Sequence, residues 1–241
     1  MNCVYSDYMI YWQEHTYKEI EKRISDDLIV ILPIGSVEEH STHLPLNTDT
    51  LQALYVVEEI AKRINALVLP QIEYGWVKSV ESFKGTISIE FDTLKILVKD
   101  ILTSLVNQGI KNIVILSGHA SSAHMSALKM AALDIEKAKI MLLSDYDIAF
   151  ELRGTLVPED DNHAGIIETS RILAIKKEAV RDKMEFEKKD MPKYMVIKDK
   201  REYYPKGTFS DPNGANSKLG NDVNHIIIER ITSLIQENFR G

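Results

Sequence analysis

Short apolar runs alternate along the chain with longer segments in which apolar residues recur every three or four positions. A continuous apolar and β-branched run indicates a strand covered on both faces, whereas the longer period indicates an amphipathic helix. The predicted strands are 27–34, 66–72, 110–116 and 140–144. The predicted helices are 16–25, 51–65, 92–108, 122–137, 165–177 and 222–238.

This alternation predicts right-handed βαβ crossovers in a mainly parallel sheet with helices on both faces. The expected fold class is therefore α/β, a three-layer α/β/α sandwich. We expect one domain over residues 1–241, because no linker, low-complexity tract or repeat interrupts the chain. Residues 74–89 are typical of an irregular loop that returns to a short strand, and residues 183–216 are polar without a clear period.

The loop after the first predicted strand is dense in metal-binding residue types. Glu38 and His40 are two positions apart, so their side chains point the same way in an extended segment. Asp49 follows after a bend at Pro45. Two carboxylates and an imidazole suit Zn, Mn or Fe(II). The alternative is a solvated polar loop in which Asp49 caps the next helix.

Two further loops carry the same residue types. His119 follows the third predicted strand among small residues that allow a ligand to approach, whereas His124 falls inside the next helix and is left out of the site. His163 precedes a helix and is a candidate general acid or base, with Glu168 as a candidate ligand. Alternatively, Asp161 or Asn162 merely caps that helix and Glu168 faces water.

Taken together, the three loops make a binuclear hydrolytic site plausible. Two metals sharing Asp49 would hold a hydroxide between them and polarise a substrate carbonyl. The chain contains no G-x-S-x-G, H-E-x-x-H, Walker A or G-x-G-x-x-G motif, so a covalent-nucleophile mechanism has little support.

Composition limits the binding partners and the cell compartment that we expect for this protein. The net charge of −7 with interspersed signs argues against a nucleic-acid surface. A single cysteine, Cys3, excludes an internal disulfide and a thiolate zinc cluster, and suits a reducing compartment. We find no secretory signal and no apolar run long enough to span a membrane, so we expect a cytoplasmic protein.

The segment GSVEEHSTHLPLNTD, residues 35–49, resembles the first motif of the creatininase family of metal-dependent amidohydrolases, G-S-x-E-Q-H-G-x-H-L-P-L-x-T-D. Residues 117–119 are similar to the family's N-G-H motif, and residues 163–170 to its H-A-G-x-x-E-T-S motif. With weaker matches at 83–86 and 211–220, the resemblance extends over nearly the whole chain.

The resemblance implies hydrolysis of a non-peptide or cyclic C–N amide bond in a small molecule. It also implies two divalent metal ions, with Zn preferred over Mn or Fe(II), and a homo-oligomer, commonly a hexamer. Carried over by position, Glu38, Asp49 and His119 hold one metal, His40 and Asp49 hold the other, and His163 moves a proton to the leaving nitrogen.

Some positions depart from the family pattern. Creatininase proper has a glutamate ligand two residues after the motif histidine, where this chain has Ser121. We expect Glu168 to replace that ligand, and Ser121 and Asn162 to contact the substrate. Glu39 stands where glutamine is usual, and the tryptophans that cover creatinine have no counterpart in the later segment.

Three alternatives stay open from the sequence. They are a deformylase acting on a formamidopyrimidine ribonucleotide in flavin or deazaflavin biosynthesis, a peptide-processing enzyme of the mycofactocin type, and a non-catalytic metal-binding protein. The residues do not decide which amide is cleaved.

Overall fold

The computed structural model describes residues 9–239, and Cys3 lies outside this range. Four strands form one sheet in the order β2-β1-β3-β4, and every neighbouring pair is parallel. The strands are β1 (Ile29–Ile34), β2 (Ala66–Val68), β3 (Asn112–Ser117) and β4 (Lys139–Ser144). The predicted α/β class with a parallel sheet is confirmed, whereas the single-domain assignment stays a prediction.

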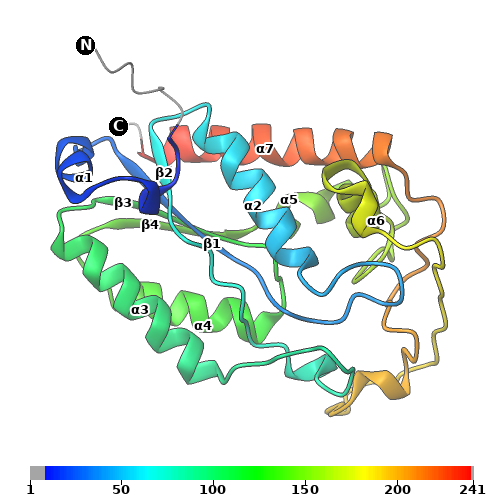
Figure 1. The fold of residues 1–241 in the computed structure, drawn as a ribbon. Helices are drawn as coiled ribbons and strands as arrows, with labels where there is room; N and C mark the ends of the chain where they lie inside the picture. Colours follow the sequence, from blue (N-terminus) through cyan, green and yellow to red (C-terminus); the bar gives the residue numbers. More distant parts are fainter. Residues whose placement is uncertain (1–8, 240–241) are drawn as a thin grey trace.

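Helices cover both faces of this sheet, α3 and α4 on one side and α2 and α7 on the other (Figure 1). The α-helices are α1 (Tyr17–Arg23), α2 (Thr48–Ala61), α3 (Phe91–Asn107), α4 (Ser122–Leu133), α5 (Asp145–Ala149), α6 (Ile166–Ile175) and α7 (Ser217–Phe239). The short 3₁₀ helices are η1 (Trp12–Glu14), η2 (Lys78–Val80), η3 (Phe150–Leu152), η4 (Lys177–Ala179) and η5 (Lys200–Glu202).

The central strand β1 explains why the apolar runs are continuous. Its successive side chains point to opposite faces of the sheet. Ile29 and Ile31 belong to the core that includes residues of α2 and α7, whereas Val30 and Leu32 belong to the core that includes residues of α3 and α4. Both faces are buried, so polar residues are excluded from the whole strand.

The structure corrects two strand predictions. The strand expected at 66–72 ends at Val68, just before Pro70, which has no N–H to donate to a sheet. The short strand expected near residue 89 is reduced to isolated bridges at Ile87 and Ser88.

None of the helices between residues 9 and 239 combines the length and the apolar character that a membrane span requires.

Two helix predictions also need correction. Helix α5 was not predicted, because it has only five residues and follows β4 directly; a capping box between Ser144 and Asp147 begins it. Helix α7 begins at Ser217, five residues before the predicted start at 222.

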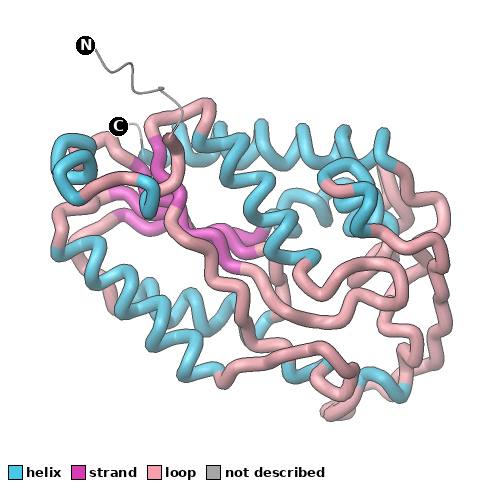
Figure 2. Tube along the Cα trace, in the orientation of Figure 1, coloured by secondary structure: helices cyan, strands magenta, loops and turns pink. Residues whose placement is uncertain are grey.

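The loops gather beyond the carboxyl ends of the strands, on the right of the view in Figure 2. Two glycines there lie against the first turn of α2. A Cβ atom on Gly118 would come within 2.1 Å of the Asp49 carbonyl oxygen, and one on Gly35 within 2.2 Å of Thr50 Oγ1. Only glycine allows the ends of β1 and β3 to approach α2 this closely.

Candidate active site

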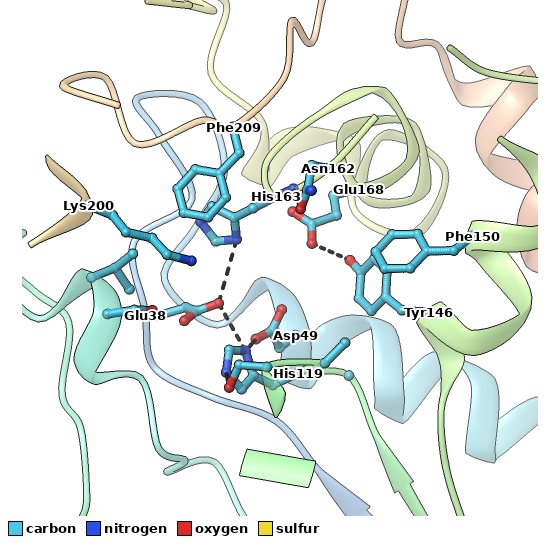
Figure 3. A pocket seen from close by; sticks show the side chains of 15 residues that line it. Glu38, Asp49, His119, Tyr146, Phe150, Asn162, His163, Glu168, Lys200 and Phe209 are labelled. Atoms are coloured by element: carbon cyan, nitrogen blue, oxygen red, sulfur yellow. Dashed lines mark hydrogen bonds and ion pairs between the residues drawn. The ribbon is translucent and has the colours of Figure 1, made fainter. Parts of the chain in front are cut away.

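Asp49 lies at the point where the loops converge (Figure 3). Its Oδ1 atom is 3.1 Å from His40 Nε2, and its Oδ2 atom is 3.1 Å from His119 Nδ1. Ser36 donates a hydrogen bond of 2.7 Å to Oδ2. Asp49 is therefore not the N-cap of α2, a position held by Asn47, but a buried carboxylate between two histidines.

Two groups of metal-ligand atoms share this carboxylate. Ligand atoms of Glu38, Asp49 and His119 lie within 4.8 Å of one another, as do ligand atoms of His40, Asp49 and Glu168. A third group combines Glu38 and His40 with His163. All five residues that the sequence indicates as metal ligands belong to the first two groups, so the geometry permits the expected ligand sets.

The charge balance of this cluster suits cations. Glu38, Asp49 and Glu168 are each at most 5% exposed. Within residues 9–239, no lysine or arginine nitrogen lies within 4.0 Å of these three carboxylates. Buried carboxylates without a compensating cation are costly, and mixed carboxylate and imidazole ligands fit Zn or Mn.

The pKa values of the histidines reflect the same excess of negative charge. Burial alone lowers the pKa of His40, but Asp49, Glu168 and Glu38 outweigh it and raise that pKa well above its usual value. At His119, burial also acts downward, yet Glu38 and Asp49 raise the pKa to about 10. An imidazole binds metal only when it is neutral, so metal binding at these histidines would release protons.

Glu168 is held from two sides. It accepts hydrogen bonds from the Tyr146 hydroxyl and, at 2.5 Å, from the backbone N–H of Ala164. Ala164 has a left-handed φ of 53°, an uncommon conformation for a residue with a side chain. Gly165 is the N-cap residue of α6, but the Asp161 carboxylate accepts hydrogen bonds from the first N–H groups of the helix, from Ile166 at 2.6 Å and from Ile167 at 3.2 Å. Neither Asp161 nor Asn162 is therefore the N-cap residue of α6, and Glu168 is buried and does not face water, so the capping alternative is wrong.

His163 lies at the edge of the metal-ligand cluster. Its Nδ1 atom is 3.7 Å from Glu38 Oε1, and its Nε2 atom is 2.9 Å from the carbonyl oxygen of Glu39. Burial and His40 lower the pKa of His163, but Glu39 and Glu38 prevail and raise it. The ring also packs 4.8 Å from Phe209 and 4.5 Å from His40, centre to centre. These contacts orient an imidazole able to hold a proton beside the pocket.

A cavity of about 160 Å³ opens beside the cluster. The predicted substrate contacts Ser121 and Asn162 both line it, and Ser121 Oγ is 2.7 Å from His119 Nε2. His124, which the sequence places outside the site, does not line the cavity: its ring packs edge-on against that of His119 at 4.9 Å, and its Nε2 atom is 3.2 Å from Ser117 Oγ.

Sequence reasoning missed four residues that line the cavity: Tyr146, Phe150, Lys200 and Phe209. Phe150 and Phe209 supply aromatic surface in a pocket for which we expected no tryptophan. The capping box of α5 was the available signal for Tyr146. Lys200 and Phe209 lie in the polar segment 183–216, where no periodicity marks them.

A fully buried ion pair supports the helices around Glu168. Arg171 Nη2 is 2.6 Å from Asp145 Oδ2, and Arg171 Nε donates to Asn224 at 2.8 Å. Neither charged side chain is exposed. The pair joins α6 to α5 and α7, so it connects the helix that carries Glu168 with the one that carries Tyr146.

Comparison with known proteins gives a full-length relationship. The family described as creatininase, creatinine amidohydrolase, matches residues 13–235. The chain is 29% identical over 249 residues to creatinine amidohydrolase from Pseudomonas putida, covering 94% of this chain and 96% of that protein. It is also 31% identical over 153 residues to the mycofactocin precursor peptide peptidase of Mycolicibacterium smegmatis, covering 61% of this chain and 58% of that one.

Solved creatininase structures have the same fold. A structure described as creatininase with Mn matches with a TM-score of 0.86 and 27% identity, covering 96% of this chain and 99% of the other. A creatininase variant of Zn-Zn type matches with a TM-score of 0.85, 28% identity and the same coverage. A variant complexed with creatine matches with a TM-score of 0.84 and 28% identity, covering 97% of this chain and all of the other.

Proposed function

The chain belongs to the creatininase family, and we propose that it is a metal-dependent hydrolase cleaving a non-peptide or cyclic C–N amide bond in a small molecule. The observation that carries this proposal is the carboxylate of Asp49, shared by two adjacent groups of buried ligand atoms. Relatives of the chain include an amidohydrolase, a peptidase and a 3-dehydro-scyllo-inosose hydrolase, so the substrate requires a separate test.

Glu38, Asp49 and His119 would hold one divalent cation, and His40, Asp49 and Glu168 the other. Two such cations polarise a substrate carbonyl and lower the pKa of water. Zn and Mn are the first candidates, because relatives are described with them and because both accept mixed oxygen and nitrogen ligands. Fe(II) suits the same ligands.

The residues around the cations complete the proposed mechanism. His163 would hold a proton beside Glu38 and donate it to the leaving nitrogen as a general acid. The backbone carbonyl of Glu39, 2.9 Å from His163 Nε2, fixes the ring in one orientation. Ser121 and Asn162 would contact the substrate from the cavity wall. Assembly as a homo-oligomer and a cytoplasmic location stay predictions.

Metal reconstitution tests this proposal. Apo protein would be loaded separately with Zn, Mn and Fe(II), its metal content measured, and hydrolysis assayed on creatinine, formamides and a short peptide. We expect two metals per chain and activity that follows occupancy, with both reduced by Glu38→Gln or His119→Ala. Protein that binds two metals but hydrolyses nothing in the panel would support the non-catalytic alternative, which Ser121 at a family ligand position favours.

His163→Gln should lower kcat by about 10²- to 10⁴-fold, the usual contribution of a general acid, while two metals stay bound. The measurement is kcat beside metal content for the same preparation. His225→Gln is the matched control, because His225 is exposed on α7 and is not among the residues that line the cavity. Loss of a metal in His163→Gln would instead make His163 a ligand, as the group with Glu38 and His40 allows.

A further inference from the structure

Lys200 reaches into the pocket from the segment 183–216 (Figure 3). It is half-buried in the short helix η5. Among the described residues, no carboxylate oxygen lies within 4.0 Å of its Nζ atom, whereas the exposed side chains of Lys99 and Lys111 have ion-pair partners at 2.7 and 2.6 Å. Lys200 is therefore a cationic group directed at the cavity without a direct ionic partner.

The position of Lys200 is fixed by its neighbours in the sequence. Asp199 accepts hydrogen bonds from Ser82 Oγ at 2.7 Å and from the Arg201 N–H at 2.9 Å. The Arg201 guanidinium lies 5.0 Å from the centre of the Phe83 ring. These contacts anchor η5 to the loop around η2, so Lys200 differs from a free surface lysine.

Within the pocket, the Lys200 ammonium lies 4.6 Å from the centre of the Phe209 ring, a cation-π contact. The same ring packs 4.8 Å from His163. Burial lowers the pKa of Lys200, and the carboxylates of Glu38 and Glu39 oppose that effect. Lys200 and His163, the proposed proton donor, therefore both contact the Phe209 ring.

The charge count of the loaded pocket indicates what Lys200 would bind. Two divalent cations bring four positive charges, which the carboxylates of Glu38, Glu39, Asp49 and Glu168 balance. The ammonium of Lys200, together with the proton that His163 would hold, then leaves the pocket with an excess of positive charge facing the cavity. In a partly buried site such a charge is weakly screened, and a charge-assisted contact to an anion is strong.

We propose that Lys200 is a specificity-determining residue that binds an anionic group, a carboxylate or a phosphate, carried by the substrate. The inference rests on the proposed hydrolase function and narrows its substrate class. Because Lys200 and His163 contact the same ring, the anionic group would lie only a few bonds from the scissile amide. Compact acidic amides are therefore favoured over neutral lactams.

Calorimetry with the Zn-loaded full chain tests this proposal through three probes that share an acetamide. N-acetylglycine carries a carboxylate, the phosphate monoester of N-acetylethanolamine carries a phosphate, and N-acetylglycinamide is neutral. We expect at least one anionic probe to bind the wild type about tenfold or more tightly than the neutral one. Comparison of the two anionic probes identifies which group is preferred.

Lys200→Met should remove this preference and leave the affinity for N-acetylglycinamide unchanged, whereas Lys200→Arg should retain much of it. Lys84→Met is the control, because Lys84 is an exposed lysine on the loop beside η5. Equal affinity of the wild type for all three probes, no binding of any, or an equal loss for all three in Lys200→Met would overturn the proposal. Binding requires no turnover, so a failure of the hydrolase function is distinguished from a failure of anion recognition.

Discussion

Asp49→Asn is expected to remove both metals together and lower hydrolysis by at least about 10³-fold, because two metals normally supply several kcal/mol of transition-state stabilisation. The two oxygens of Asp49 face different partners, Oδ1 toward His40 and Oδ2 toward His119. Asparagine keeps the shape but offers a single neutral oxygen. Metal content by mass spectrometry, measured beside kcat, should fall from two per chain toward zero.

A variant of a residue that belongs to only one ligand group should behave differently from Asp49→Asn. Glu168→Gln should weaken only the metal held with His40 and leave the metal at His119 in place, since Glu168 belongs to one ligand group alone. Asp134→Asn is the neutral control, because its carboxylate is exposed and pairs with Lys99 on the surface. One metal bound with undiminished affinity in Asp49→Asn would show that the carboxylate is not shared.

Arg171→Met should lower the free energy of unfolding by about 3–5 kcal/mol, the typical cost of leaving one member of a buried ion pair unpartnered. The pair with Asp145 is fully buried, and methionine has a comparable volume without the charge. Urea unfolding at neutral pH measures the loss. Arg63→Met is the control, because its pair with Glu229 is exposed and worth at most about 1 kcal/mol.

The pH dependence of this loss follows from the unpartnered carboxylate. Burial already raises the pKa of Asp145, and Arg171 acts against that shift. Without Arg171, the folded-state pKa rises further above the unfolded one, so the folded state gains protons more readily. The stability deficit of Arg171→Met should therefore shrink as the pH falls toward the usual carboxylate range and grow as it rises.

A double variant separates charge from packing in the same pair. Asp145→Asn combined with Arg171→Met should be more stable than Arg171→Met alone, because the uncompensated charge is gone. If the double variant is as unstable as the single one at every pH, lost packing and the lost hydrogen bond to Asn224 explain the effect instead.

The sequence predicted the parts of the molecule that depend on local pattern. Strands β1 and β3 are continuous apolar runs because both faces of the sheet are covered, and that pattern is readable without coordinates. Parallel strands place their carboxyl ends at one edge, so Glu38 and His119 were expected to meet although 81 positions separate them. Their ligand atoms are 3.1 Å apart.

The parts of the pocket that the sequence did not predict depend on individual contacts, which leave no periodic pattern in the sequence. Tyr146 reaches Glu168 from a helix too short to show amphipathic spacing. The segment that carries Lys200 and Phe209 is held by individual side-chain contacts, such as the hydrogen bond from Ser82 to Asp199. The hydrogen bond from Ser82 to Asp199 joins residues 117 positions apart, and a polar loop gives no hint of its partner.

The close packing of Gly35 and Gly118 against the first turn of α2 also limits how this protein can diverge. Any side chain at Gly118 would press on the backbone of Asp49, and any side chain at Gly35 on that of Thr50. Either displacement moves the one carboxylate on which both proposed cation positions depend. We therefore expect a side chain at either glycine to disturb both proposed cation positions at once, whereas loss of a single ligand such as Glu168 would affect only one of them.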